Sequence, residues 1–286
     1  MSSFYTFGGL TVKTDAPFHA DGLYHLSFYK AEPTENPDVI FTVHTNCENI
    51  PEPEGTFIAE VNKRYWYKTQ NGYAFFDKIE ALTDKILNLM VADETFSHIE
   101  LYLCPTELLQ IKNDERPYHL TQEILRYVFL FHEGTIIHAS SLAYDGKGLL
   151  FSAPSGTGKS THTNLWTKFV PGTEIVNDDM PIVRLENGIP YLYGAPWSGK
   201  NSIHKNIRVP LNAVVFIERN TTSSLSPMDS MEGVWKLIEA IRKPVVPALA
   251  EKNLDIIGKI IEALPVYRLQ CDISPEAVKA SMQALE

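Results

Sequence analysis

The sequence has few cysteines and no long apolar run. Cys47, Cys104 and Cys271 form no CxxC pair, so we expect buried or incidental thiols in a reducing compartment. The longest apolar runs, such as 127–131 and 213–217, are too short to cross a bilayer. The first residues also lack the basic and apolar regions of a secretory signal. We therefore expect a cytoplasmic protein with no membrane partner.

Positive charge is scarce as well. The chain of 286 residues has 25 lysines and arginines against 35 aspartates and glutamates, which gives a formal net charge of −10. Binding to a nucleic-acid backbone depends on concentrated positive charge, so we expect no nucleic-acid partner. Hydrophobic residues make up 44% and charged residues 21% of the chain, a balance that allows a sizeable core.

The first part of the chain predicts mostly strands. Segments 22–30, 38–44 and 55–61 are rich in aromatic and β-branched residues and are separated by turn-forming residues. A hairpin is predicted over 64–78, with a type I′ turn at Asn71-Gly72. No residues of this part stand at a spacing that carries a known chemistry. It therefore predicts a β-rich accessory or substrate-docking domain.

Further along, strands alternate with helices and hairpins. The apolar spacing predicts a helix from Thr121 to about His132. Hairpins are predicted with turns at Asp145-Gly146 and Asn187-Gly188, and an apolar, buried strand over 211–219. We therefore predict an α+β, or mixed α/β, chain with a β-rich domain over residues 1–115 and a second domain over residues 116–286.

A glycine-rich stretch interrupts this second domain at residues 151–166, "FSAPSGTGKSTHTNLW". It fits the phosphate-loop pattern G-x-x-x-x-G-K-[ST] at Gly158, Lys159 and Ser160, whereas Ala153 replaces the first glycine. A strand is predicted before the loop and a helix after it, as the pattern requires. The alternative is an ordinary glycine turn.

The loop predicts a cradle for the phosphates of a nucleotide. Its glycines let successive backbone N–H groups turn toward anionic oxygens, and the helix start adds its positive dipole end. Lys159 is expected to reach the β- and γ-phosphates, and Ser160 to bind Mg²⁺. The predicted nucleotide-binding residues are Ala153, Pro154, Ser155, Gly156, Thr157, Gly158, Lys159, Ser160 and Thr161.

Two acids follow the next apolar strand, at Asp178 and Asp179. Near a triphosphate, one carboxylate can hold Mg²⁺ while the other accepts a proton from the incoming hydroxyl. We assign the metal to Asp178 together with Ser160; the alternative is a pair of turn-capping acids. His138 lies on the strand before the loop, where a hairpin could bring it near the phosphates, although a lone strand histidine can also be structural.

The segments "IIHASSL", "SGTGKST" and "IVNDD" together resemble the catalytic domain of the bacterial HPr kinase/phosphorylase family, over roughly residues 133–270. The "SGTGK" core is also similar to ATP-dependent phosphoenolpyruvate carboxykinase. The resemblance implies that His138 is an active-site histidine and that Ser160 is the Mg²⁺ ligand. It also implies that Asp179 is the base in phosphorylation and that Asp178 flanks it.

One segment departs from that family. The family has a metal-binding glutamate after the aspartates, whereas "GAPWSGKNSIHKNIR" lacks it and offers cations instead. These cations could neutralise a transferring phosphoryl group, or they could be a solvated basic face. They are Lys200, His204, Lys205 and Arg208. The piece "GAPWSGK" resembles HPr-kinase-like proteins that accompany peptide-modification gene clusters, some of which phosphorylate serine on a peptide.

The motifs and the resemblance together predict a kinase that uses ATP, or another nucleoside triphosphate, with Mg²⁺. The expected acceptor is a serine or threonine hydroxyl of a peptide or small protein, and the resemblance allows a homo-oligomer. Two alternatives stay open. One is a small-molecule enzyme like phosphoenolpyruvate carboxykinase, and the other is a non-catalytic nucleotide-binding regulatory module.

Overall fold

The computed structural model describes residues 2–16, 18, 24–78, 85–105, 115–199 and 202–286. The described chain is mixed α/β, with two sheets and five α-helices, in agreement with the predicted fold class. It divides into two compact units, residues 1–131 with 244–250, and residues 132–243 with 251–286. In the described residues, none of the helices has the length and apolar character needed to cross a membrane.

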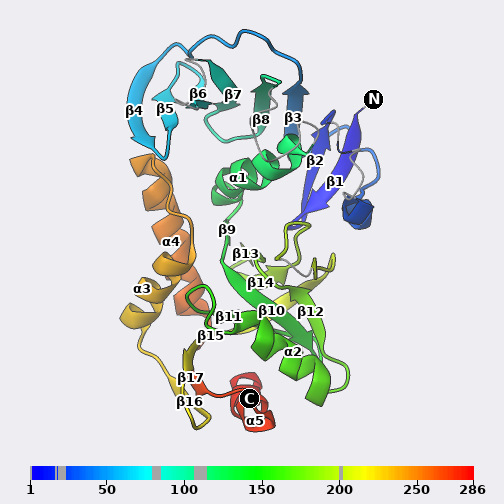
Figure 1. The fold of residues 1–286 in the computed structure, drawn as a ribbon, viewed down its shortest axis with the longest axis vertical. Helices are drawn as coiled ribbons and strands as arrows, with labels where there is room; N and C mark the ends of the chain where they lie inside the picture. The colour runs from blue at the N-terminus through cyan, green and yellow to red at the C-terminus, as the bar shows by residue number, and fades with distance from the viewer. Residues whose placement is uncertain (1, 17, 19–23, 79–84, 106–114, 200–201) are drawn as a thin grey trace. The chain divides into compact units, whose positions relative to one another are not determined.

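The first unit is built on an eight-stranded sheet in the order β1-β2-β3-β8-β7-β6-β5-β4 (Figure 1). Strand β3 pairs in parallel with β2 and β8, and the other pairs are antiparallel. The strands are β1 Ser3–Phe7, β2 Leu10–Thr14, β3 Val39–His44, β4 Thr56–Val61, β5 Arg64–Lys68, β6 Gly72–Lys78, β7 Ile86–Asp93 and β8 His98–Leu103. The expected strands over 38–44 and 55–61 are therefore confirmed.

The strand predicted over 22–30 is wrong in its described part, because Tyr24–Tyr29 form a 3-10 helix, η1. Its buried side chains, Leu26 and Tyr29, stand three residues apart. That spacing puts both on one side of a 3-10 helix, which has three residues per turn, but on opposite faces of a strand. The period of the buried residues, and not their β propensity, decides the local structure here.

The hairpin over 64–78 is confirmed, but its predicted turn is wrong. Strands β5 and β6 pair up to Lys68 and Tyr73, and the backbone N–H of Thr69 donates to the carbonyl of Gly72. Gly72 thus begins β6 instead of lying in the turn. A Cβ at Gly72 would lie 2.2 Å from the backbone oxygen of Ala92 on β7. The glycine is needed for this close approach of two backbones, not for a positive φ.

Helix α1 spans Arg116–Leu130 and begins five residues earlier than predicted, with a proline in its first turn. Arg116 is buried, and its guanidinium donates to the carbonyls of Cys104 and Leu87 in the first unit. Tyr127 of α1 contacts the rings of Trp66 and Phe96. Because of this packing, α1 groups with the β-rich unit, and the compact units divide at 131/132, whereas the predicted domains divide at 115/116.

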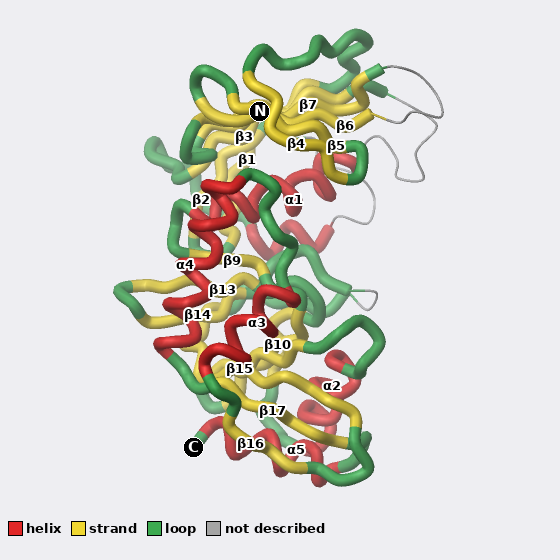
Figure 2. The backbone as a smooth tube through the Cα atoms, turned by 90° about the vertical axis from the view of Figure 1, so that its left-hand side faces the viewer, coloured by secondary structure: helices red, strands yellow, loops and turns green. Residues whose placement is uncertain are grey.

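The second unit is built on a nine-stranded sheet with the path β12-β10-β11-β15-β14-β13-β9. Figure 2 shows strands β9, β10 and β13 to β17 of this sheet in yellow. Strand β15 is twelve residues long; its first part pairs with β14, and its second part lies between β11 and β17, parallel to both. The remaining strand, β16, pairs with β17. The strands are β9 Gly134–Ile136, β10 Ala139–Tyr144, β11 Lys147–Ser152, β12 Glu174–Asn177, β13 Ile182–Glu186, β14 Ile189–Tyr193, β15 Arg208–Arg219, β16 Ser224–Pro227 and β17 Val266–Cys271.

Helices α2 Lys159–Phe169, α3 Ser230–Ala240 and α5 Pro275–Met282 belong to this unit. Helix α4, Pro247–Ala263, begins in the first unit and belongs to the second from residue 251 on. Helix α2 contacts β10, β11, β12 and α5, and its Trp166 is fully buried in a cluster with Phe151, Val215 and Leu269. Both predicted turns of this unit are confirmed by positive φ angles at Asp145-Gly146 and Asn187-Gly188. The hairpin β10–β11 thus leads directly into the glycine-rich loop.

Candidate functional site

The glycine-rich loop joins the end of β11 to the start of α2, as the motif requires. Gly156 and Gly158 have φ angles of 77° and 121°, which residues other than glycine rarely adopt. A Cβ at Gly156 would meet nothing within 4 Å, so the backbone conformation itself requires glycine there. Ala153 is not among the positive-φ residues, which explains why alanine fits at the first glycine position of the pattern.

The start of α2 leaves backbone donors available. Gly158 is the N-cap residue, and no side chain of the described residues caps it. The first intrahelical bond runs from the N–H of His162 to the carbonyl of Gly158 at 2.9 Å. The amides of the first turn therefore have no partner within the helix. Together with the helix dipole they suit an anion.

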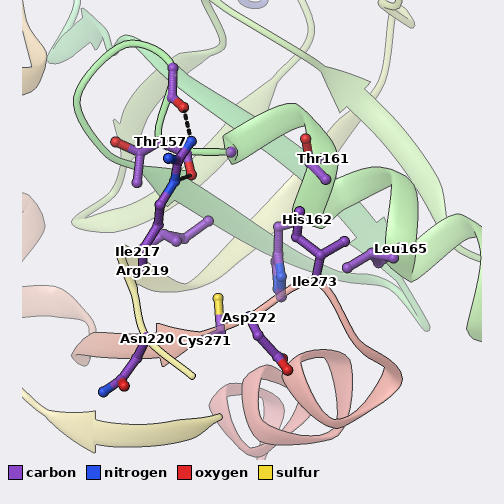
Figure 3. A pocket seen from close by; sticks show the side chains of 12 residues that line it. Thr157, Thr161, His162, Leu165, Ile217, Arg219, Asn220, Cys271, Asp272 and Ile273 are labelled. Carbon is purple, nitrogen blue, oxygen red and sulfur yellow. Dashed lines mark hydrogen bonds between the residues drawn. The ribbon is translucent and has the colours of Figure 1, made fainter. Parts of the chain in front are cut away.

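Arg219, the last residue of β15, holds the loop from outside. Its Nε donates to the carbonyl of Thr157 at 3.0 Å and its Nη2 to that of Gly156 at 2.5 Å; Figure 3 shows this guanidinium beside the loop. In a trans peptide the N–H points opposite to the carbonyl, so the Gly158 amide points away from Arg219. Such an arrangement is typical of a phosphate cradle. Sequence reasoning missed this arginine, although it ends the predicted strand 211–219.

Lys159 is held next to the loop. Its side chain is 7% exposed, and Nζ donates to the carbonyl of Ala153 at 2.9 Å. Burial lowers the pKa of Lys159, while the nearby charge of Asp179 acts in the opposite direction. A phosphate in the loop would add negative charge beside this ammonium and favour its charged form.

The two acids lie at the same edge of the sheet as the loop. Strand β10 is antiparallel to both β11 and β12, so the carboxyl ends of β11 and β12 point the same way. Asn177, fully buried at the end of β12, donates to the carbonyls of Ala195 and Trp197 and accepts from the N–H groups of Asp179 and Met180. This asparagine therefore sets the backbone path of the acids. Sequence reasoning missed it; the signal is a polar residue that ends an apolar strand.

Asp178 and Ser160 come close to each other. The Oγ of Ser160 donates to the backbone carbonyl of Asp178 at 3.4 Å. The side chain of Asp178 is 4% exposed, and its Oδ1 accepts the N–H of Gly199 at 2.8 Å. Burial raises the pKa of Asp178; the Gly199 bond lowers it and the charge of Asp179 raises it further.

Asp179 forms a pair with His138. The distance from Nε2 of His138 to Oδ1 of Asp179 is 3.4 Å, and the side chains are 37% and 36% exposed. The backbone keeps the two together, because the N–H of Ala139 donates to the carbonyl of Asp179 at 3.0 Å. Ser152, at the end of β11, donates to the carbonyl of His138 at 3.1 Å. A solvent-accessible carboxylate next to an imidazole is thus placed at the edge where the loop begins.

The predicted cation cluster is not brought together as one group. His204 forms an isolated β-bridge with Asn177 beside the acids. Lys205 instead pairs with Glu174 at 2.9 Å. Lys200 lies outside the described residues.

Arg208 is engaged on the surface. Its Nη2 pairs with Glu186 at 2.5 Å, and its guanidinium lies 3.6 Å from the ring centre of Tyr191. Lys205 is therefore bound to an exposed carboxylate and Arg208 to a half-buried one, in surface pairs that contribute little to stability. Their predicted contact with a phosphoryl group stays a prediction.

The residues near the loop suit Mg²⁺ bound partly by substrate phosphates and water better than a metal ion bound by protein side chains alone. Among the described residues, no three His, Cys, Asp or Glu side chains gather as a metal site. Mg²⁺ prefers oxygen ligands and is usually held by one or two protein groups together with substrate phosphates and water. The Oγ of Ser160 and the carboxylate of Asp178 are oxygen donors of this kind, within the same small region.

Comparison with known proteins adds little to this picture. No family model matches the chain, and no curated protein matches its sequence. Among solved structures, it is similar to the HPr(Ser) kinase/phosphatase from Coxiella burnetii, at 13% sequence identity, over 52% of this chain and 92% of that chain, with a TM-score of 0.29. A likeness this weak carries no argument. The resemblance noted in the sequence therefore stays a prediction.

Proposed function

We propose that this chain is a phosphotransferase that uses ATP, or another nucleoside triphosphate, with Mg²⁺ and transfers the γ-phosphoryl group to a hydroxyl. The observation that carries the proposal is that two groups lie at the same edge of the sheet. One is the glycine-rich loop with Lys159, and the other is the Asp179–His138 pair. The first binds polyphosphate and the second can accept a proton, which is what phosphoryl transfer to a hydroxyl needs.

The loop and Lys159 would bind and orient the phosphates. The amides at the start of α2 and the glycine turns donate to phosphate oxygens. The Nζ of Lys159 exchanges the carbonyl of Ala153 for the β- and γ-phosphates. Because these groups are already in place before substrate arrives, little reorganisation is needed as charge shifts during transfer.

Asp179 would act on the acceptor. It takes the proton of the hydroxyl as the hydroxyl oxygen bonds to the γ-phosphorus, and the bond from that phosphorus to the bridging oxygen of the nucleoside diphosphate breaks. His138 positions this carboxylate from 3.4 Å. The acid is more than a third exposed, so an acceptor side chain can reach it.

Ser160 and Asp178 would hold Mg²⁺. When bound, the ion neutralises charge on the β- and γ-phosphates. A neighbouring divalent cation favours the ionised form of Asp178, which offsets the effect of its burial.

The acceptor class rests on the sequence resemblance alone. We infer a serine or threonine of a peptide or small protein, and a cytoplasmic location. That the protein has no nucleic-acid partner and no membrane partner, and that it forms a homo-oligomer, stay predictions as well.

The test is transfer of labelled γ-phosphate from ATP to serine- and threonine-containing peptides in the presence of Mg²⁺. Lys159→Ala is expected to lower the rate on the order of a hundredfold or more, the loss typical for one preorganised group. Lys168→Ala, on the last turn of the same helix, serves as the matched control and should act like wild type. A wild-type rate no higher than that of Lys159→Ala would contradict the proposal, and ATP binding without transfer would favour a regulatory module.

A further inference from the structure

Two cavities border the glycine-rich loop. The larger one, of about 550 Å³, lies between the first turns of α2 and the ends of β15 and β17, and its wall is mostly apolar (Figure 3). The smaller one, of about 450 Å³, is lined by residues 154–157 of the loop, the end of β15 and Lys236 of α3. Both volumes are within the range of small-ligand sites, but of these two cavities only the smaller one has a lysine in its wall.

The side chain of Lys236 is available to an incoming anion. It is half-buried, and it makes no ion pair with a carboxylate of the described residues. The other charged groups of the same wall are engaged. Glu218 accepts from Nε of Arg268 at 3.1 Å, and Arg219 donates to two loop carbonyls. In the described part of this wall, Lys236 is therefore the cation that can bind a carboxylate.

Helix α3 leads from this cavity to the proposed catalytic pair. Its last residue is Ala240, whose carbonyl accepts the N–H of His138 at 2.7 Å. Lys236 stands four residues earlier, about 6 Å along the helix axis. The end of α3 that carries Lys236 is thus next to the backbone of the histidine that pairs with Asp179.

A second lysine follows the helix. Lys243 stands three residues after Ala240, is exposed, and makes no ion pair with a carboxylate of the described residues. Three residues of chain span at most about 11 Å, so the backbone of Lys243 stays close to that of His138. Arg242, between them in sequence, already has a partner. Two available ammonium groups therefore border the catalytic pair in a chain whose formal net charge is −10.

The acids of α3 do not use these lysines. Glu232 is bound by Arg268. Glu239 is exposed and stands three residues after Lys236, a spacing at which helical side chains can meet. The two form no ion pair, and Lys236 lines the cavity instead. The positive charge at this end of the helix is thus left for a binding partner.

We propose that the acceptor is a peptide with acidic residues beside the phosphorylated serine or threonine, and that Lys236 and Lys243 bind these acids. The acceptor hydroxyl lies at Asp179, and an acid two or three positions away in an extended peptide is about 7–10 Å from it. That span is comparable to the length of chain between Ala240 and Lys243. This inference rests on the proposed function, because it takes a hydroxyl acceptor to lie at Asp179.

The experiment uses three peptides of about eleven residues, each with one central serine. The positions two and three residues away on both sides are aspartate, alanine or lysine. Transfer of labelled γ-phosphate by the full chain with ATP and Mg²⁺ gives kcat/KM for each peptide. The aspartate peptide is expected to exceed the alanine peptide by about fivefold or more, the effect of a good surface ion pair. The lysine peptide should be the poorest, and added salt should reduce the preference.

Variants test the two lysines. Lys243→Glu should reverse the order of the aspartate and lysine peptides. Lys279→Glu, at an exposed position of α5, makes the same change in net charge and should keep the wild-type order. Lys236→Gln should raise KM for the aspartate peptide about fivefold with little change in kcat. Weaker ATP binding by this variant, measured by calorimetry, would instead make Lys236 a phosphate ligand and overturn its role in peptide binding.

The outcomes separate this inference from the proposed function. Equal kcat/KM for the three peptides, or a preference for the lysine peptide, would overturn the acidic acceptor while leaving the phosphotransferase intact. A preference for the aspartate peptide that survives unchanged in both Lys243→Glu and Lys236→Gln would overturn the assignment to these lysines. Transfer to none of the peptides would contradict the proposed function itself, and this inference with it.

Discussion

The two sides of the glycine-rich loop differ in chemistry. On the side of β12, Asp179 lies 3.4 Å from His138, Asp178 precedes it, and the buried amide of Asn177 determines the backbone path of both acids. On the side of β15 and β17 the wall of the larger cavity is mostly apolar and includes the buried ring of His162. The comparison teaches that one loop can border two surfaces of different chemistry, one with carboxylates and one that is mostly apolar.

The largest expected effect tests the acid side. Asp179→Asn keeps the size of the side chain but removes its ability to accept a proton. The rate of phosphoryl transfer should fall by about two to four orders of magnitude, the range for loss of a general base, while ATP affinity changes little. Single-turnover kinetics measures the step directly. Asp145→Asn, in the exposed β10–β11 turn, should leave the rate unchanged, and a normal rate in Asp179→Asn would remove this acid from the proposed mechanism.

The second prediction concerns the buried support of the acids. Asn177→Ala leaves the carbonyls of Ala195 and Trp197 and the amide of Asp179 without their partner. We expect a loss of about 3 kcal/mol in the free energy of unfolding, since unsatisfied buried groups are expensive. Urea denaturation measures it. The control is Asn164→Ala, at an exposed position of α2. If both variants lose the same small amount of unfolding free energy, the hydrogen bonds of Asn177 do not stabilise the fold.

The third prediction uses the buried histidine on the other side. The pKa of His162 is lowered from 6.5 to about 4 by burial. Between these two pH values the histidine is therefore protonated in the unfolded chain and neutral in the folded chain. The stabilising contribution is thus present above pH 6.5 and is lost as the pH falls toward 4. From pH 7.5 to 5.0 the loss should be about 2 kcal/mol from this group.

Urea unfolding at the two pH values tests this histidine. Carboxylates also titrate in this range, so the informative quantity is the difference between wild type and His162→Phe. That variant should lose less stability on acidification than wild type does. His119→Gln, at an exposed histidine of α1, should keep the wild-type dependence. If His162→Phe and wild type lose the same stability on acidification, then burial in the folded protein does not disfavour the charged form of His162.

The smallest effect is expected at Arg219, which lies at the end of β15 on the side of the loop away from the acids. Arg219→Lys cannot donate to the carbonyls of Thr157 and Gly156 in the same forked manner. ATP binding should weaken by about fivefold, as expected for bonds near the surface that cost about 1 kcal/mol. Arg268→Lys, which alters a surface pair with Glu218, is the control in the same calorimetric titration. Unchanged affinity would show that the loop holds its conformation without Arg219.

Local sequence patterns predicted several elements correctly. Turn residues with positive φ identified the hairpins at Asp145-Gly146 and Asn187-Gly188, because few residues tolerate that conformation. The same reasoning failed at Gly72, which is required by the carbonyl of Ala92 on a neighbouring strand. The strand prediction over 22–30 rested on aromatic and β-branched residues, and it failed because Tyr24–Tyr29 form a 3-10 helix, in which Leu26 and Tyr29 are buried on one side.

The sequence by itself determined the conformation of the glycine-rich loop, because the positive φ angles of Gly156 and Gly158 and the bond from Lys159 to Ala153 involve only neighbouring residues. It also placed two acids at the end of a strand. Only the tertiary structure decided which partners meet at that edge: Asn177 under the acids, Arg219 outside the loop, and His162 in a cavity between α2, β15 and β17. The reason is physical, because these contacts join parts of the chain that are distant in sequence. Asn177 lies 18 and 20 positions from Ala195 and Trp197, Arg219 lies 62 positions from Thr157, and His162 lies 119 positions from Ser281. The order of the strands along the sheet also differs from their order along the chain.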